Sequence, residues 1–188
     1  MILEGLITTT DPESGMHLAP MGPTVDGPDF QSFLLRPFPT SQTYQNLIRT
    51  RQGVLHITDD ALLIAKAAIG EAGQPAHHPA TMVDGYLLHD CCRAFEFRVS
   101  DVDDRHERIH LTAQIVYTHR VRDFFGFNRA KHAVLEAAIM ATRFHLIPAE
   151  EIDREWARLK VIVNKTAGPA EREAMALLES KWAARAGR

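Results

Sequence analysis

The sequence predicts a mainly β chain with C-terminal helices, an α+β fold in which an antiparallel sheet closes, or nearly closes, into a barrel. Three observations support this. Short apolar runs separated by Gly, Pro and Asp fill the first half, apolar and polar residues alternate in two stretches from Phe95 to Val99 and from Ile109 to Tyr117, and the period becomes helical after Gly126. Many short strands in one small chain favour a barrel, because closure removes exposed sheet edges.

The first half is expected to contain four strands and two short helices. The strands are expected at 2–9, 16–25, 33–36 and 53–58. Thr40 or Ser41 is expected to cap a helix that ends by Thr50, and Asp59 or Asp60 a second helix that runs to Ile69. Residues 70–80 contain two prolines and no apolar period, so a surface loop is expected there.

The second half is expected to contain a long hairpin and three helices. Phe95, Phe97 and Val99 alternate with polar residues, and so do residues 109–118, which predicts two strands joined by the polar link 101–108. Helical spacing follows Gly126, and Pro148 and Pro169 stand near the starts of two more helices. We expect one domain, with a barrel and two short helices over 1–126 and a helical segment packed on it over 127–188.

Composition excludes several classes of protein. The 188 residues are 45% hydrophobic and 24% charged with a net charge of -3, so neither disorder nor general attraction to nucleic acid or an anionic membrane is expected. No apolar run approaches the roughly 20 residues of a membrane span, and Glu4 stands where a basic leader would be expected. Adjacent Cys91 and Cys92 suit reduced thiols, so we expect a cytoplasmic protein.

Several segments resemble metal sites without their structural context. His106–His110 matches H-E-x-x-H, but this zinc pattern requires a helix, and in a strand residues four apart are separated by about 13 Å. Residues 101–106 resemble a calcium loop in which Arg105 and His106 replace a ligand and the turn glycine. The pair His77-His78 lacks further ligands at suitable spacing. No metal is expected, and no phosphate loop, dinucleotide fingerprint or nucleophile elbow occurs.

The run from Leu35 to Leu47 has the composition of a phosphate site. It places the guanidinium of Arg36 at a strand end and three hydroxyls, those of Thr40, Ser41 and Thr43, at a helix N-terminus. Unpaired N–H groups at such a terminus also attract anions. The alternative is that a hydroxyl merely caps the helix while Arg36 pairs with a surface acid.

A second cationic segment opens the long helix after Gly126. Cations at a helix N-terminus oppose the macrodipole, so this placement favours a nearby anion. Arg129 and His132 are three residues apart and share a helix face, whereas Lys131 points elsewhere. The alternative is ordinary solvated charge.

Beyond these single motifs, the order of several segments resembles a family of archaeal and bacterial flavoproteins of unknown function, domain of unknown function 447. That family is similar to flavin-reductase-like proteins with an FMN-binding split barrel. The segments that carry the resemblance are Glu4–Leu6, Thr8–Thr10, His17–Pro23, Arg36–Leu47, His56–Asp60 and Gly126–His132.

The resemblance implies a homodimeric split β-barrel of the Greek-key type with FMN near the subunit interface. The residues it implies for the phosphate and ribityl chain are Arg36, Thr40, Ser41, Thr43 and Asn46. Those it implies beside the isoalloxazine ring are Met21, Gly22, Pro37 and Phe38. Further candidates are Asn128, Arg129 and His132.

The expected function is therefore that of an FMN-binding flavoprotein, a flavin-reductase-like oxidoreductase that transfers hydride or electrons through FMN. NAD(P)H or another molecule would be the electron donor. No catalytic side chain is assigned, because a flavin accepts hydride without a protein nucleophile. One alternative is a non-catalytic FMN carrier dimer, linked through its relatives to tetrahydromethanopterin-dependent one-carbon metabolism. Another is a structural dimer with an empty cleft.

Overall fold

The structure, a computed structural model, describes residues 1–187 and divides the chain into two compact units. The first unit comprises Met1–Thr58 and Gln74–Phe124, and the second comprises Asp59–Gly73 and the chain from Phe125 onward. The main boundary lies next to residue 126, where the sequence period changes. The second unit also takes in residues 59–73, which the sequence analysis assigned to the strand-rich part.

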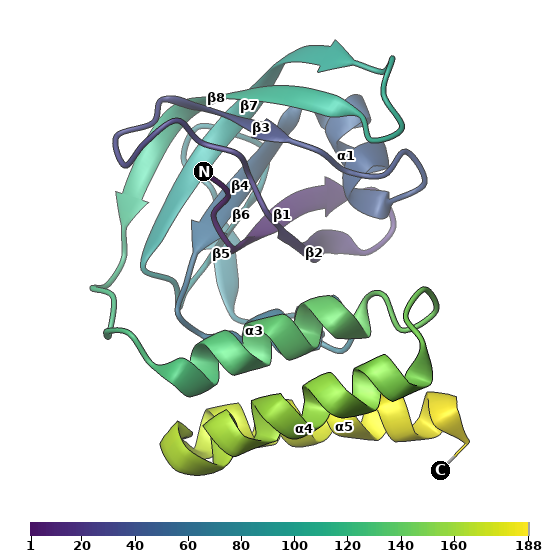
Figure 1. Ribbon diagram of the computed structural model, residues 1–188. Helices are drawn as coiled ribbons and strands as arrows, with labels where there is room; N and C mark the ends of the chain where they lie inside the picture. The colour runs from purple at the N-terminus through teal and green to yellow at the C-terminus, as the bar shows by residue number, and fades with distance from the viewer. Residues whose placement is uncertain (188) are drawn as a thin grey trace. The chain divides into compact units, whose positions relative to one another are not determined.

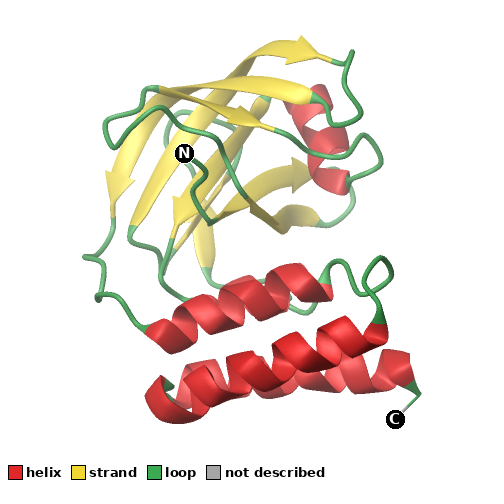
Figure 2. Ribbon diagram, viewed as in Figure 1, coloured by secondary structure: helices red, strands yellow, loops and turns green. Residues whose placement is uncertain are grey.

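Within the described residues, the first unit contains eight strands and one helix. They are β1 (Gly5–Asp11), β2 (Gly15–Met21), β3 (Ser32–Leu35), α1 (Gln42–Thr50), β4 (Gln52–Ile57), β5 (His77–Pro79), β6 (Tyr86–Leu88), β7 (Arg93–Asp103) and β8 (His110–Arg120). Six strands form an antiparallel sheet in the order β2-β1-β4-β7-β8-β3 (Figure 1). Thr24 bridges both Leu34 and Ile2, so the N-terminal segment continues the sheet beyond β3. The curled sheet, yellow in Figure 2, confirms the predicted barrel.

Alternate residues of the long hairpin fill the barrel, as predicted. Phe95, Phe97 and Val99 are buried in one cluster with apolar side chains of the neighbouring strands. Gly53 makes room for this packing, because a Cβ there would lie 2.8 Å from a ring carbon of Phe97. The core therefore depends on the period-two pattern and on one glycine opposite an aromatic ring.

Glu96 departs from that pattern. The alternation predicts a solvent-facing carboxylate, but Glu96 is fully buried. The loop before β6 covers it, and its oxygens accept the backbone N–H groups of Thr81, Met82 and Val83 at 2.7, 2.5 and 3.1 Å. The ring of His119 adds a fourth contact at 2.7 Å. Burial would raise the pKa of Glu96, but the hydrogen bonds from His119 and the backbone outweigh it and lower that pKa.

The expected surface loop over residues 70–80 is wrong in part. Residues 77–79 form β5, which pairs with β6 in a separate two-stranded sheet. Pro79 tolerates this position because a two-stranded ladder leaves one edge of each strand unpaired. The adjacent cysteines, Cys91 and Cys92, are reduced and buried just before β7, and burial raises the pKa of Cys91 to about 11.

The second unit is helical. Its described elements are α2 (Ala61–Ala68), α3 (Arg129–Ala141), α4 (Ala149–Thr166) and α5 (Pro169–Ala186). The predicted alanine-rich face of α3 packs with buried side chains of the other three helices, among them Trp156 and Leu178. Asp60 caps α2 by accepting the N–H of Leu63 at 2.9 Å, which decides between the two predicted caps. No described helix is long and apolar enough to cross a bilayer.

Candidate functional site

The loop from β3 into α1 begins the candidate phosphate site, hereafter the cradle loop (residues 36–41). Ser41 caps α1, because its hydroxyl accepts the N–H of Tyr44 at 3.2 Å and donates to the carbonyl of Phe38 at 2.8 Å. Of the two predicted caps, Ser41 therefore fills the role. Its hydroxyl is committed to fixing the shape of the loop.

The remaining polar groups of the cradle loop are unpaired. Arg36 and Thr40 are exposed, and across residues 1–187 neither side chain has an ion-pair or hydrogen-bond partner. The backbone N–H groups of Gln42 and Thr43 also lack an acceptor in the described part of the chain. The surface ion pair considered for Arg36 is thus not formed. One guanidinium, one hydroxyl and two N–H groups remain available at this helix start.

Thr43 and Asn46 occupy a different position from the other cradle candidates, because both are buried and engaged within the protein. The Thr43 hydroxyl lies 3.2 Å from Nε2 of His17 on β2. Asn46 donates to the hydroxyl of Thr9 on β1 at 3.0 Å and accepts from Gln42 at 3.0 Å. The contacts with His17 and Thr9 fasten α1 to the β1–β2 hairpin.

The partners of Thr43 and Asn46 were not predicted from the sequence. Thr9 is buried, and a buried hydroxyl needs a hydrogen-bond partner. The run of three threonines, Thr8–Thr10, is the sequence feature that could have indicated this contact. His17 is half-buried, and burial lowers its pKa despite the opposing charge of Asp11. The His17 ring contacts α1 through Thr43.

The four residues predicted beside the flavin ring all lie in the first unit. Met21 is partly buried against the barrel core. Gly22 makes room for the N-terminal segment, since a Cβ there would lie 2.9 Å from Cγ2 of Ile2. Pro37 is buried, and Phe38 is 49% exposed. Of these four, Phe38 presents the largest apolar surface.

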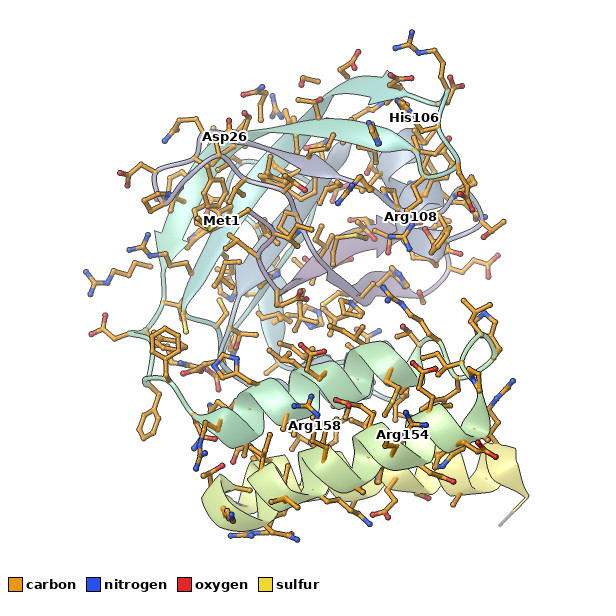
Figure 3. All side chains as sticks on the ribbon, in the orientation of Figure 1. Met1, Asp26, His106, Arg108, Arg154 and Arg158 are labelled. Atoms are coloured by element: carbon orange, nitrogen blue, oxygen red, sulfur yellow. The ribbon has the colours of Figure 1, made fainter. Side chains whose placement is uncertain are left out.

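Arg108 is a residue that the sequence analysis missed as part of this region. It stands in the turn between β7 and β8, beside the cradle loop (Figure 3). Its guanidinium carbon lies 4.2 Å from the centroid of the Phe38 ring. The H-E-x-x-H match drew attention to its neighbours, His106 and His110, and no local pattern links Arg108 to residue 38.

The same turn corrects the predicted separation of those two histidines. Their rings stack with centroids 4.1 Å apart and planes 22° apart, in contrast to the expected 13 Å. Residues 105–108 form a bend, so the chain reverses where an extended strand was assumed. Among residues 1–187, no group of three or more His, Cys, Asp or Glu side chains is arranged to hold a metal ion.

Asn128, Arg129 and His132 belong to the second unit. Asn128 caps α3, accepting the N–H groups of Ala130 and Lys131 at 2.8 and 3.2 Å, and it donates to the carbonyl of Thr166 at 3.0 Å. Arg129 and His132 are exposed, and the His132 ring stacks on Phe127 with centroids 6.1 Å apart.

Lys131 points elsewhere, as predicted. Its ammonium donates to the carbonyl of Asp59 at 2.5 Å and lies 4.0 Å from the Asp59 carboxylate and 3.9 Å from that of Glu171. Two internal acids therefore offset the unfavourable position of this cation at a helix N-terminus.

Known structures share this architecture. An FMN-bound protein of the DUF447 family from Methanosarcina mazei matches with a TM-score of 0.80 over 96% of this chain and 94% of that chain, at 19% identity. The 2-nitrobenzoate 2-nitroreductase of Pseudomonas fluorescens matches with a TM-score of 0.54 over 62% of this chain and 64% of that chain, at 21% identity. The flavin reductase HpaC in complex with NADP+ matches with a TM-score of 0.56 over 68% of this chain and 82% of that chain, at 11% identity. These likenesses confirm the predicted split-barrel fold.

Sequence comparison defines the family. No curated protein matches the chain. Residues 3–122, however, match the N-terminal domain of a family described as protein of unknown function (DUF447), and residues 128–180 match the second part of the same family. The two matches together cover most of the sequence and follow the change from strands to helices. The chain therefore belongs to the DUF447 family.

Proposed function

We propose that this protein binds FMN and that the cradle loop and the first turn of α1 hold the FMN phosphate. The observation that carries the proposal is the set of unpaired groups there: the Arg36 guanidinium, the Thr40 hydroxyl and two backbone N–H groups. A phosphate dianion needs such donors, and charge-assisted bonds from arginine are the strongest of them. The fold shared with the FMN-bound protein of Methanosarcina mazei supports the same cofactor.

The residues present fit FMN in two respects. The cradle loop offers charge and N–H groups for the phosphate, while half-exposed Phe38 and partly buried Met21 offer apolar surface for a flat ring. Ser41 shapes the loop, and Thr43 and Asn46 anchor the helix. In this assignment Arg36 and Thr40 contact the phosphate directly. The buried pair acts by keeping the helix start in place.

When bound, FMN would supply the hydride or electron transfer of an oxidoreductase. The chain would bind and orient the flavin and exclude water from one face of it. NAD(P)H or another small donor would reduce it, a proposal supported by the fold shared with a nitroreductase and with a flavin reductase that binds NADP+. We also propose a cytoplasmic location, to which two reduced and buried thiols are suited.

A two-fold homodimer is part of this proposal. Two phenylalanines in the second unit, Phe125 and Phe127, are 88% and 90% exposed. The backbone N–H of Phe125 donates to the Asp59 carboxylate at 2.8 Å. Exposed aromatic surface of this kind is typical of protein contacts. Sedimentation at micromolar concentration should give a dimer, and a monomer that retains stoichiometric FMN would contradict it.

The decisive experiment is to identify and quantify the flavin bound to the purified protein, and then to mix it anaerobically with NADH or NADPH. One FMN per chain is expected, with bleaching of the flavin absorbance by one nucleotide. FMN that dithionite reduces but neither nucleotide reduces would favour the carrier or a different donor. A protein that takes up no FMN at micromolar concentration would refute the proposal.

A further inference from the structure

We propose that Arg108, from the turn between β7 and β8, is a second phosphate-binding cation at the cradle loop. This inference rests on the proposed function, since it assigns a residue to the same site. It places one phosphate ligand on a segment about seventy residues away in sequence from Arg36, and it makes the β7–β8 turn part of the cofactor site.

The first step is the position of the turn. The N–H of Ile109 donates to the carbonyl of Pro37 at 3.2 Å, which ties the end of the turn to the cradle loop. Ile109 is itself buried in the barrel core and Pro37 is also buried, so neither end of this bond is free to move away. Figure 1 shows the β7–β8 turn at the same end of the sheet as α1. Residue 108 is therefore held next to the loop that the phosphate would occupy.

The second step is the direction of the side chain. The Arg108 guanidinium lies over the Phe38 ring, with 4.2 Å between its central carbon and the ring centroid. An aromatic face attracts a cation but provides no hydrogen-bond acceptor in the plane of the guanidinium. The N–H groups at the guanidinium edge therefore remain able to donate to phosphate oxygens. Phe38 sets the position of the cation without neutralising it.

The third step is the lack of a competing anion. Arg105, in the same turn, is neutralised by Asp103, to which it donates at 2.8 and 2.7 Å. Arg108 has no carboxylate partner within the described chain. Two exposed and uncompensated arginines therefore belong to this region: Arg36 precedes Phe38 by two residues in the cradle loop, and Arg108 lies over the Phe38 ring. Two such cations suit the double charge of a phosphate monoester better than one.

The test compares FMN with riboflavin, which lacks the phosphate, by flavin fluorescence titration of the flavin-free full chain. Arg108→Ala should weaken FMN binding at least tenfold and change riboflavin binding less than twofold. Arg105→Ala is the matched control from the same turn, and it should leave both affinities within twofold of the wild type. Arg108→Gln keeps a long side chain without the charge and should resemble Arg108→Ala, whereas Arg108→Lys should recover part of the FMN affinity.

Each contrary outcome identifies what is wrong. Equal loss of FMN and riboflavin in both neutral variants, or no loss of FMN, would overturn the role of Arg108, even if Arg36→Ala is selective for FMN. If the wild-type protein itself binds neither flavin, the proposed function fails and the assignment of Arg108 fails with it. Thermal unfolding of each variant shows whether the barrel is intact, and the Gln variant decides the question if the Ala variant does not fold.

Discussion

The N-termini of α1 and α3 have similar sequences but differ in whether their charged groups have partners in the fold. Each begins with a polar cap, Ser41 or Asn128, near positively charged residues. At α3, the acids Asp59 and Glu171 surround the cation Lys131. At α1, Arg36 and two N–H groups have no partner within residues 1–187. The comparison shows that the fold supplies internal acids to Lys131 but, within residues 1–187, none to Arg36.

The largest effect on stability is expected at the start of α3, where acids lie near Lys131. Asp59→Ala removes a buried carboxylate that accepts the N–H of Phe125 and lies near Lys131, so the free energy of unfolding should fall by about 3 kcal/mol. Urea unfolding followed by circular dichroism measures this loss. The matched control is Asp60→Ala, which removes the α2 cap and should cost about 1 kcal/mol. Equal losses would show that Asp59 acts only locally.

At the start of α1, where Arg36 has no partner, substitution should change FMN affinity. Arg36→Ala should weaken FMN binding by about 2 kcal/mol, roughly thirtyfold, because charge-assisted bonds to phosphate are lost. The free energy of unfolding should change by less than about 0.5 kcal/mol, since Arg36 is exposed and unpaired. Isothermal titration with FMN and riboflavin measures the first effect. A variant that loses affinity for both ligands equally would remove Arg36 from the phosphate site.

The two caps should differ modestly. Asn128→Ala removes two accepted N–H bonds and a bond to Thr166, whereas Ser41→Ala removes one accepted N–H bond and a bond to the Phe38 carbonyl. Each should destabilise by about 1 kcal/mol, with the larger loss at Asn128. Thermal unfolding compares them. Only Ser41→Ala is expected to weaken FMN binding as well, and a matching loss at Asn128 would support the further predicted role of that residue toward FMN.

The smallest effect is expected on the free energy of unfolding at acidic pH. The pKa of Glu96 is lowered in the fold, so its stabilisation is complete above the ordinary value of 4.5 and is lost as pH falls through the lowered folded pKa. Wild-type stability should therefore decrease below pH 4.5. Glu96→Gln cannot ionise, so its unfolding free energy should depend less on pH in that range. Parallel pH profiles for the two proteins would show that this carboxylate does not contribute to the acid sensitivity.

Several features of this protein followed from the sequence alone. The β7 and β8 strands, a hydroxyl cap at Thr40 or Ser41 and the apolar face of α3 were predicted, because each depends on periodicity or on neighbouring residues. The order of short segments likewise indicated the DUF447 family. These predictions hold because the side-chain period of a strand or helix is set by backbone geometry.

Tertiary structure decided which polar groups are satisfied. Glu96 is buried because a loop fifteen residues earlier in the chain folds over it, and His106 stacks on His110 because the chain reverses between them. Arg108 reaches Phe38 across seventy residues, while Lys131 meets acids from two other segments. The residues next to each of these positions in the sequence do not indicate these long-range contacts. The net charge at a helix start depends on every group that folding brings near it, since electrostatic energy follows distance in space.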